Sequence, residues 1–425
     1  MKPVLSIDAV RAAVQQMPDN GLAAARLTAL ARLDADGLPT ATHEDWKYTD
    51  LGPVVELSNQ WLARTGPAVA VADTAIAAIT DSIAASWLVI RNGVVDAGSM
   101  AGFAAGEVQV ELLSLSGKAL DDGIPLSSLN IALLQDGICI RVPANTAHAG
   151  IVGLLFIDHA ATEVGVSQAR IVIELEAGSA ANFVEYHASS GGAAHYANTA
   201  IDVTLADGAS CNYVRIQDRN SNHDQTARLG VALQKDCRLQ HAAFDLGGKL
   251  VRNDLDIKLS GAGSSASFCG LYLAGGEQHV DNHTRVDHLV GPARSEQDYR
   301  GIAAGASRCV WNGKAVVHRH ADGTNASQTN HNLLLSANAE IDAKPELEIY
   351  ADDVKASHGT TIGELDPGAL FYLRTRGLDE TAARRLLIRA FAQKIVTLSP
   401  LPSIHETISE KVAAQVAALI TGEAP

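Results

Sequence analysis

Cysteine is scarce in this sequence, and the few that occur are widely spaced. The two closest, Cys211 and Cys237, are 26 residues apart, so no CxxC pair is present to hold zinc or an iron–sulfur cluster by local spacing. An odd, scattered set is typical of reduced thiols. Four of the five lie in β-like runs, where we expect small buried apolar side chains. The five are Cys139, Cys211, Cys237, Cys269 and Cys309.

Basic residues and long apolar runs are also in short supply. The net charge is -15 and the isoelectric point is near 5.4, whereas nucleic acids and anionic membranes select for clustered Lys and Arg. No run approaches the roughly 18 apolar residues of a membrane span, and residues 1–20 lack the apolar core of a signal peptide. We therefore expect a cytoplasmic protein whose partners are neither nucleic acid nor membrane.

Three common catalytic motifs are missing as well. Gly248-Lys249 and Gly313-Lys314 lack the upstream glycine and the following Ser or Thr of a phosphate-binding P-loop. The nucleophile motif GxSxG and the zinc-binding motif HExxH do not occur. The chain is therefore predicted not to hydrolyse ATP itself.

Length and composition predict more than one structural region. With 425 residues and 47% hydrophobic content, the chain exceeds what one core usually supports. We divide it into an N-terminal helical and mixed region (1–150), a β-rich core (151–365) and a C-terminal helical region (366–425).

In the first region, residues 6–38 have apolar side chains at helical spacing, which predicts helices. A mixed, alanine-rich stretch follows, with hairpin signals at Asn92-Gly93 and Asp136-Gly137.

An internal repeat distinguishes the core region. Four copies of a strand-and-turn pattern, such as IELEAGSA and VTLADGAS, place an equivalent leucine 30, 28 and 26 residues apart, and another alternating strand follows each. Strand, turn and strand without a helical signal predicts a β-solenoid whose coils pack on one another, with a two-sheet β-sandwich or jelly roll as the alternative. The leucines are Leu175, Leu205, Leu233 and Leu259, and the segments near Ala303 and Leu335 are read as later copies.

After the core, the pattern becomes helical again. The expected helices run from Asp366 to Arg376, from Asp379 to about Val396, and from Ser403 to Gly422. Ser403 and Glu406 have the spacing of a capping box. The apolar stripe of the last helix, Ile404 to Leu419, either closes the end of the solenoid, as we expect, or docks a partner. The apolar face of the middle helix is predicted to hold Leu386, Leu387, Ala390, Phe391 and Ile395.

Histidine and aspartate are concentrated between His279 and His331. His318 and His320 could share one face of a strand and chelate a metal. No third or fourth ligand can be assigned from the sequence, and polar stacks are ordinary on the outer face of a solenoid. We therefore assign no metal to this segment.

One histidine stands out in the stretch KPELEIYADDVKASHGTTIGELDPGALFYLRTRG, residues 344–377. LEIYADDV has the composition of a strand, His358-Gly359 interrupts it, and Asp366-Pro367 begins a helix. His358 is therefore expected in a hydroxyl-rich turn between a strand and a helix, a junction where reactive groups often occur. From this pattern alone, His358 would simply hydrogen-bond to the turn.

The same stretch closely resembles the C-terminal part of SufD proteins of the SufB/SufD family, which act with SufC in bacterial iron–sulfur cluster assembly. HEDWKYTDL, residues 43–51, resembles the N-terminal signature of that family, although physical chemistry alone makes Trp46 and Tyr48 plain anchors on a core. EQHVDNHTRVDH, SEQDYRGI, SRCVWNGKAVVH and ASQTNHNLLLS extend the resemblance from Gln278 to Gln393. The shortage of cysteine favours a SufD-like over a SufB-like member.

The resemblance implies a right-handed parallel β-helix and a non-catalytic scaffold subunit of a SufB–SufC–SufD complex. It makes His358 the candidate ligand of a transient iron–sulfur cluster shared with SufB, because a family histidine at this position is a proposed ligand. A cysteine and a carboxylate of SufB would face it, and imidazole, more labile than thiolate, would let the cluster leave. In the family, the SufC ATPase binds the C-terminal helical region, and ATP binding by two SufC subunits would strain the site.

One position departs from the family pattern. Many SufD proteins have a cysteine two residues before the histidine, but this chain has Ala356 there, so sulfur would come from SufB or elsewhere. The sequence leaves open whether the shared site is intact, whether a flavin stays on the complex, and whether the isolated chain forms a homodimer through an open sheet edge.

The alternative function is a β-solenoid carbohydrate-active enzyme with Asp352 and Asp353 as acid and base. Adjacent strand residues point to opposite faces, however, so this pair could not flank one bond without a bulge. Co-purification with SufB and SufC would separate the two functions.

Overall fold

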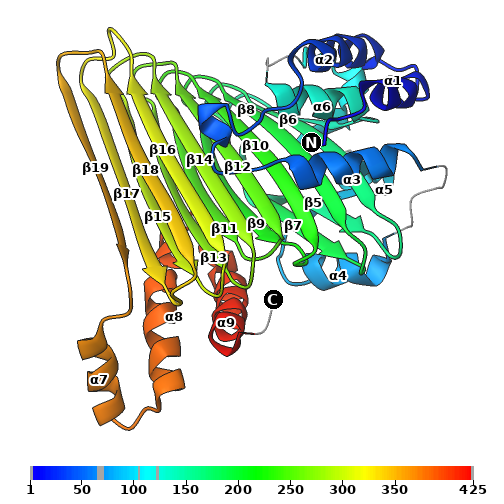
Figure 1. Cartoon of the computed structure of the whole chain (residues 1–425). Helices are drawn as coiled ribbons and strands as arrows, with labels where there is room; N and C mark the ends of the chain where they lie inside the picture. The colour runs from blue at the N-terminus through cyan, green and yellow to red at the C-terminus, as the bar shows by residue number, and fades with distance from the viewer. Residues whose placement is uncertain (1–2, 65–70, 104–105, 121–123, 423–425) are drawn as a thin grey trace.

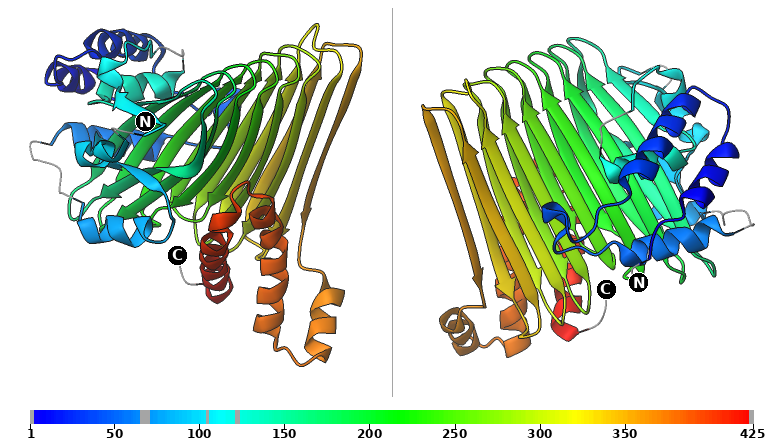
Figure 2. Two further views of the ribbon diagram at one scale, coloured as in Figure 1. Left: turned by 180° about the vertical axis from the view of Figure 1, so that it is seen from behind. Right: turned by 45° about the horizontal axis from the view of Figure 1, so that its top comes forward.

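The computed structural model is an elongated β-solenoid with helices at both ends, and it describes residues 3–64, 71–103, 106–120 and 124–422 (Figure 1). Within these residues, two sheets of ten and nine strands run the length of the molecule. From β4 onward successive strands alternate between the sheets, so each turn contributes one strand to each (Figure 2). Neighbours from β4 to β19 pair in parallel, which confirms the parallel β-solenoid over the sandwich.

The sheets are defined by their strand order. Sheet A contains β19 (Val354–Gly363), β17 (Thr324–Leu334), β15 (Arg294–Ala303), β13 (Ser265–Ala274), β11 (Arg238–Asp245), β9 (Ser210–Asp218), β7 (Ala180–Ser190), β5 (Ala147–His159), β1 (Ser86–Arg91) and β2 (Val94–Val95). Sheet B contains β18 (Glu340–Ile349), β16 (Arg308–Val317), β14 (His279–His288), β12 (Leu250–Leu259), β10 (His223–Leu233), β8 (His195–Leu205), β6 (Gly165–Leu175), β4 (Ile138–Val142) and β3 (Gln109–Leu112). From Ile138 to Gly363 the described chain makes about 8 turns.

Helices precede and follow the solenoid. The N-terminal α-helices are α1 (Ile7–Gln15), α2 (Ala23–Asp36), α3 (Gly52–Leu62), α4 (Asp73–Thr80), α5 (Ala97–Met100) and α6 (Pro125–Leu133). The C-terminal ones are α7 (Pro367–Thr375), α8 (Glu380–Leu398) and α9 (His405–Thr421). None of the helices in the described ranges is long and apolar enough to span a bilayer.

The four aligned leucines form one column of the interior. Leu175, Leu205, Leu233 and Leu259 are paired side by side in sheet B and fully buried. The later copies predicted near Ala303 and Leu335 do not continue this column. Ala303 ends a strand of sheet A, not of sheet B, and pairs with Leu334. The pattern therefore marks turns on both sides of the solenoid.

The turn that follows the leucine explains why a glycine recurs at the same distance after it. Three residues after Leu175 and Leu205, Gly178 and Gly208 adopt left-handed φ angles of +67° and +71°. The Gly178 N–H donates to the carbonyl of Asp207 one turn further on, at 2.9 Å. Glycine adopts this backbone conformation without steric cost, so the turns can stack.

The N-terminal region follows the predicted pattern in part. Helices α1 and α2 occupy the predicted segment and pack with α3 and α6 on the outer face of the first strands of sheet B. Asn92-Gly93 forms the predicted hairpin between β1 and β2, with both φ angles positive. Asp136-Gly137 does not form a hairpin, because it links α6 to β4.

The C-terminal helices occupy the predicted ranges but not the predicted place. Asp366 and Asp379 cap α7 and α8 through their side chains, and Gly422 ends α9 at φ +75°. The capping box is wrong, because Ile404 occupies the cap position of α9 and Ser403 lies in a preceding 3₁₀ turn.

Helices α8 and α9 cover the outer face of sheet A rather than the end of the solenoid (Figure 1). The prediction that the last helix closes the end of the solenoid is therefore wrong. The apolar stripe of α9 is buried against sheet A instead, because the outer face of that sheet is apolar there. The predicted face of α8 is also shifted: Leu386 and Ala390 are exposed. The buried residues of α8 are Ala383, Ile388, Ala392, Ile395 and Val396.

Candidate functional site

His358 lies within strand β19, not in a turn. It pairs with Gln328 of β17, and Ala356 pairs with Ala326. Gln328 and Ala326 are buried in the solenoid, and residues in register on parallel strands point to the same face. His358 therefore faces the solenoid interior, and the predicted strand break is wrong, because β18 already ends at Ile349 and a new strand begins at Val354.

Side-chain contacts along β19 agree with this assignment. Thr360 shares the face of His358, and its hydroxyl donates to buried Asn330 at 3.2 Å. Thr361, on the opposite face, contacts His331 at 2.9 Å. Although His358 points inward, it is exposed, since β19 and β18 are the last strands of their sheets and no further turn covers them.

No ligand set surrounds His358 in the described part of the chain. Among the described residues, no group of three or more His, Cys, Asp or Glu is arranged to hold a metal ion. All five cysteines are buried with free thiols, as the sequence predicted for four of them. Burial raises the pKa of both Cys211 and Cys269 to about 12, so these thiols stay protonated at neutral pH.

Apolar side chains surround this open end. Ile349 ends β18, the last strand of sheet B, and Tyr350 follows it. Ile362 shares the inward face of His358. Ile362 is 46% exposed and Tyr350 is 58% exposed. Exposed apolar groups beside unpaired strand edges are typical of surfaces that bind another chain.

The segment HEDWKYTDL forms a strap (residues 43–51) across the outer face of sheet B. Lys344 on β18 contacts Glu44 at 2.9 Å. Arg252 on β12 donates to the Asp45 carbonyl at 2.8 Å, and its guanidinium lies 4.3 Å from the centre of the Trp46 ring. The strap therefore ties together turns that lie toward the open end, and the anchor interpretation of Trp46 is confirmed.

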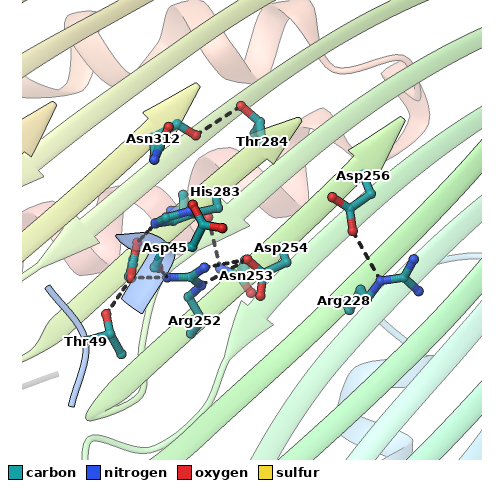
Figure 3. Close-up of polar contacts among 12 residues, drawn as sticks. Asp45, Thr49, Arg228, Arg252, Asn253, Asp254, Asp256, His283, Thr284 and Asn312 are labelled. Carbon is teal, nitrogen blue, oxygen red and sulfur yellow. Dashed lines mark hydrogen bonds and ion pairs between the residues drawn. The ribbon is translucent and has the colours of Figure 1, made fainter. Parts of the chain in front are cut away.

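The strap is fixed most firmly through a buried ionic cluster (Figure 3). The Thr49 hydroxyl donates to the Asp281 carboxylate and contacts His279 at 2.8 Å. Arg252 bonds the same carboxylate at 2.6 Å. Burial alone would raise the pKa of Asp281, but Arg252 and His283 beside it hold that pKa well below its usual range. The carboxylate is therefore ionised at neutral pH.

His318 and His320 of the polar segment lie in different surroundings. His318 contacts Asp287 at 2.8 Å. His320 is not on a strand but in the turn after β16, with φ +70°. The two rings therefore do not share a strand face, which removes the geometric basis of the chelating pair. Asp352 and Asp353 lie exposed in the turn between β18 and β19 rather than in a strand.

Helix α7 and the start of α8 project away from the solenoid (Figure 1). Every residue of α7 is at least partly exposed, including Phe371 at 69% and Tyr372 at 56%. Leu386 on α8 is also exposed. The solenoid therefore does not cover the apolar side chains of α7 and of the start of α8.

Sequence reasoning missed the polar part of the interior. Glu185, Arg215 and Asp245 are buried between the sheets, with Arg215 bonded to Asp245 at 3.0 Å. His187 is buried beside Glu185 at 2.5 Å. The signal was available, because these side chains occur at alternate positions of otherwise apolar strands.

Comparison with known proteins identifies the family. The family described as SUF system FeS cluster assembly, SufBD core domain, matches residues 156–391. The iron-sulfur cluster assembly protein SufD of Escherichia coli (strain K12) is 31% identical over 376 residues, covering 86% of each chain. A SufBD family protein of Synechocystis is 31% identical over 310 residues, covering 71% of this chain and 68% of that protein. SufD of Bacillus subtilis (strain 168) is 25% identical over 285 residues, covering 67% and 65%. Because the match spans most of the chain and includes the solenoid, the protein belongs to the SufBD family of iron–sulfur cluster assembly proteins.

Proposed function

We propose that this protein is a non-catalytic scaffold subunit of a complex of the SufB–SufC–SufD type, and that His358 contributes to a cluster assembly site at the contact with a SufB-like subunit. The observation that carries the proposal is the position of His358. It is an exposed imidazole that faces inward on the last turn of a solenoid whose end is open.

The proposed site is completed by another chain. Iron in clusters is held mainly by thiolates, but the cysteines of this chain are buried elsewhere, and Ala356 occupies the position beside His358 on the same face. A SufB-like partner would therefore supply the thiolate and a carboxylate. A single imidazole ligand among stronger ones would favour release of the cluster, which is cargo rather than a resident cofactor.

The partner would approach along the open end of the solenoid. Strands β18 and β19 each leave one edge free for pairing, and strand addition to such an edge is a common mode of recognition. Ile349, Tyr350 and Ile362 would be buried in the contact. In the isolated chain the same edges would favour a homodimer, which the SufB-like partner would replace.

A SufC-like ATPase would dock on the C-terminal helices. Helix α7 and the exposed side of α8 carry Phe371, Tyr372 and Leu386, and aromatic side chains are enriched in protein interfaces. ATP binding there would act on the solenoid through α8, because Arg300 of β15 donates to the Phe391 carbonyl at 2.9 Å.

Co-expression with SufB-like and SufC-like partners tests the proposal. The complex is purified without oxygen, and its iron content and visible absorption are compared for the native chain and His358→Ala. The matched control is His331→Ala, which removes an imidazole from the outer face of the neighbouring strand β17. The same spectra report any flavin that remains with the complex, to which we assign no residue.

We expect all three complexes to form, with cluster absorption lost only in His358→Ala. Equal cluster content in the native complex and His358→Ala would refute the role of His358. Failure of the native chain to bind either partner would refute the scaffold function.

A further inference from the structure

Strand β19, which carries His358, has little support from the rest of the solenoid. It is the last strand of sheet A and, among the described strands of that sheet, it pairs only with β17 (Figure 1). All its residues after Val354 are exposed. An uncovered edge strand opens locally more easily than a packed one, so a side chain on it keeps a fixed position only where further contacts hold the strand.

Three buried side chains near β19 form a closed ring of hydrogen bonds, which we call the amide ring. Tyr272, Asn330 and Asn332 are at most 2% exposed. The Tyr272 hydroxyl donates to Asn332 Oδ1 at 2.6 Å, Asn332 Nδ2 donates to Asn330 Oδ1 at 2.5 Å, and Asn330 Nδ2 donates to the Tyr272 hydroxyl at 3.1 Å. Each member therefore donates one bond and accepts one within the ring. A buried network that is satisfied in this way makes its members rigid.

The remaining hydrogen-bonding capacity of the amide ring is directed at β19. The Thr360 hydroxyl donates to Asn330 Oδ1, and Asn332 Nδ2 donates to the Thr361 carbonyl, both at 3.2 Å. Thr360 shares the inward face of β19 with His358 and is two residues after it. The amide ring therefore holds β19 from the interior, directly beside the position of the imidazole.

Gly301 leaves the space in which the amide ring forms. It lies between Tyr272 and Asn332 in one inward column of sheet A and pairs in register with both. A Cβ atom at Gly301 would overlap the Tyr272 ring and the Asn332 Oδ1 atom. Because glycine has no side chain, Tyr272 on β13 can reach across β15 to Asn332 on β17. The amide ring therefore connects the exposed edge strand to β13, whose inward residues are buried.

We propose that Tyr272, Asn330 and Asn332 are positioning residues for His358: they hold β19 against the solenoid and fix where the imidazole meets a SufB-like partner. The proposal rests on the proposed role of His358 and adds residues that do not themselves touch the cluster. Leucine could fill the volume of either asparagine. Hydrogen bonds depend on direction, however, so the polar side chains hold the strand in one place where apolar contacts would allow several.

Hydrogen exchange of the isolated full chain tests whether the amide ring holds β19. Thr360→Val removes the hydroxyl that donates to Asn330 and keeps the shape of the side chain, so the β19 peptide should exchange at least about threefold faster. Tyr272→Phe opens the amide ring and leaves a buried amide atom unpaired on each asparagine, so we expect at least about tenfold faster exchange. Thr360→Ser keeps the hydroxyl and should exchange within about twofold of the native rate.

Two matched controls remove the same groups elsewhere. Thr329→Val removes a hydroxyl on the outer face of β17 that donates to the Gln297 carbonyl at 3.0 Å. Tyr196→Phe removes a buried hydroxyl on β8 that contacts Thr226 at 2.7 Å, far along the solenoid from β19. Both controls should leave exchange of β19 within about twofold of the native rate.

Release of the cluster from the complex separates positioning from stability alone. The complex with SufB-like and SufC-like partners is mixed with an iron chelator, and the loss of visible absorption gives the rate of release. A displaced imidazole would hold iron less firmly, so Tyr272→Phe and Thr360→Val should release the cluster at least about fivefold faster. Thr360→Ser and both controls should release it at the native rate.

Faster exchange of β19 together with faster cluster release in the same two variants, and rescue by Thr360→Ser, would support the proposal. It would be overturned if neither variant changed exchange of β19, or if exchange rose while cluster release stayed native. Because Thr360 is exposed, its variants keep the test valid if Tyr272→Phe fails to fold. Failure of the proposed function gives a different result: His358→Ala would itself keep its cluster, and both proposals would fall.

Discussion

Replacing Thr49 by valine should release the strap from the solenoid without changing its shape. The Thr49 hydroxyl is buried and donates to the ionised carboxylate of Asp281. Hydrogen bonds to charged groups contribute about 1.5–3 kcal/mol. Because Arg252 still bonds Asp281 in the variant, the carboxylate keeps one strong partner, and we expect a loss of about 2 kcal/mol.

We choose hydrogen exchange because it measures this loss locally. Global unfolding of so long a chain would not be two-state, so it would not give a single free energy. The Thr49 and Lys47 amides donate to the carbonyls of Trp46 and Glu44, at 3.2 and 3.3 Å. They exchange when the strap opens. A loss of about 2 kcal/mol corresponds to roughly 30-fold faster exchange of the strap peptide, at about 1.4 kcal/mol for each factor of ten.

Thr42→Val is the matched control, because Thr42 is exposed and its hydroxyl contacts only Thr40 among the described partners. It should leave exchange of the strap within about twofold of the native rate. The reasoning would be refuted if Thr49→Val changed the rate by less than about twofold, or if the control changed it equally. A double-mutant cycle with Asp281→Asn should then show coupling of about 1–2 kcal/mol between the two sites.

Two further predictions concern the pH dependence of stability and the helical projection. Burial raises the pKa of Asp224 to about 6, so the folded protein keeps this proton up to about pH 6, whereas the unfolded chain releases it near pH 4. Stability therefore falls as pH rises through this window. Asp224→Asn should slow hydrogen exchange of the β10 peptide at least about fivefold relative to the native chain at pH 7.5, a gain of about 1–3 kcal/mol, but hardly at pH 4. An equal slowing at both pH values would contradict this. Phe371→Ala should weaken binding of a SufC-like ATPase at least about tenfold in calorimetry while leaving thermal stability unchanged, and unchanged affinity would exclude α7 from the contact.

Much of the solenoid could be predicted because its signal is periodic. The column of leucines repeats every turn, and a left-handed residue lies three positions after Leu175, Leu205 and Leu233. Both features follow from stacking of similar units. Helices α7 and α8 were also predictable from their caps, Asp366 and Asp379, which are local features.

The candidate site was harder to predict, because its geometry depends on distant parts of the chain. The sequence pattern predicts Asp352 and Asp353 in a strand and His358 in a turn. In the structure the two aspartates lie in the turn, and His358 lies in the next strand. Gly359 suggested a break, but an exposed edge strand tolerates glycine at small cost. The strap contacts residues more than 200 positions away, such as Arg252 from Asp45, and sequence spacing alone contains no sign of that pairing.

Charge pairing between turns is a second periodic pattern in the sequence, separate from the leucine repeat. On the outer face of sheet B, Arg228 contacts Asp202 and Asp256, which are 26 residues before and 28 residues after it. In the interior, Arg215 bonds Asp245 at a separation of 30 residues. These separations equal one turn, so complementary side chains spaced like the leucines indicate a solenoid independently of its apolar pattern.

The inner and outer pairs differ in what they contribute. Outer pairs such as Arg228 with Asp256 are half-buried, with side chains 17% and 30% exposed. They contribute less than an interior pair, because water still reaches and partly screens both charges. The buried pair of Arg215 and Asp245 cannot tolerate a shift of register, since a slip by one residue would move either side chain to the other face and leave the partner's charge buried alone. We infer that the interior pairs fix the register of successive turns, while the leucine column, which would pack in several registers, supplies most of the apolar burial.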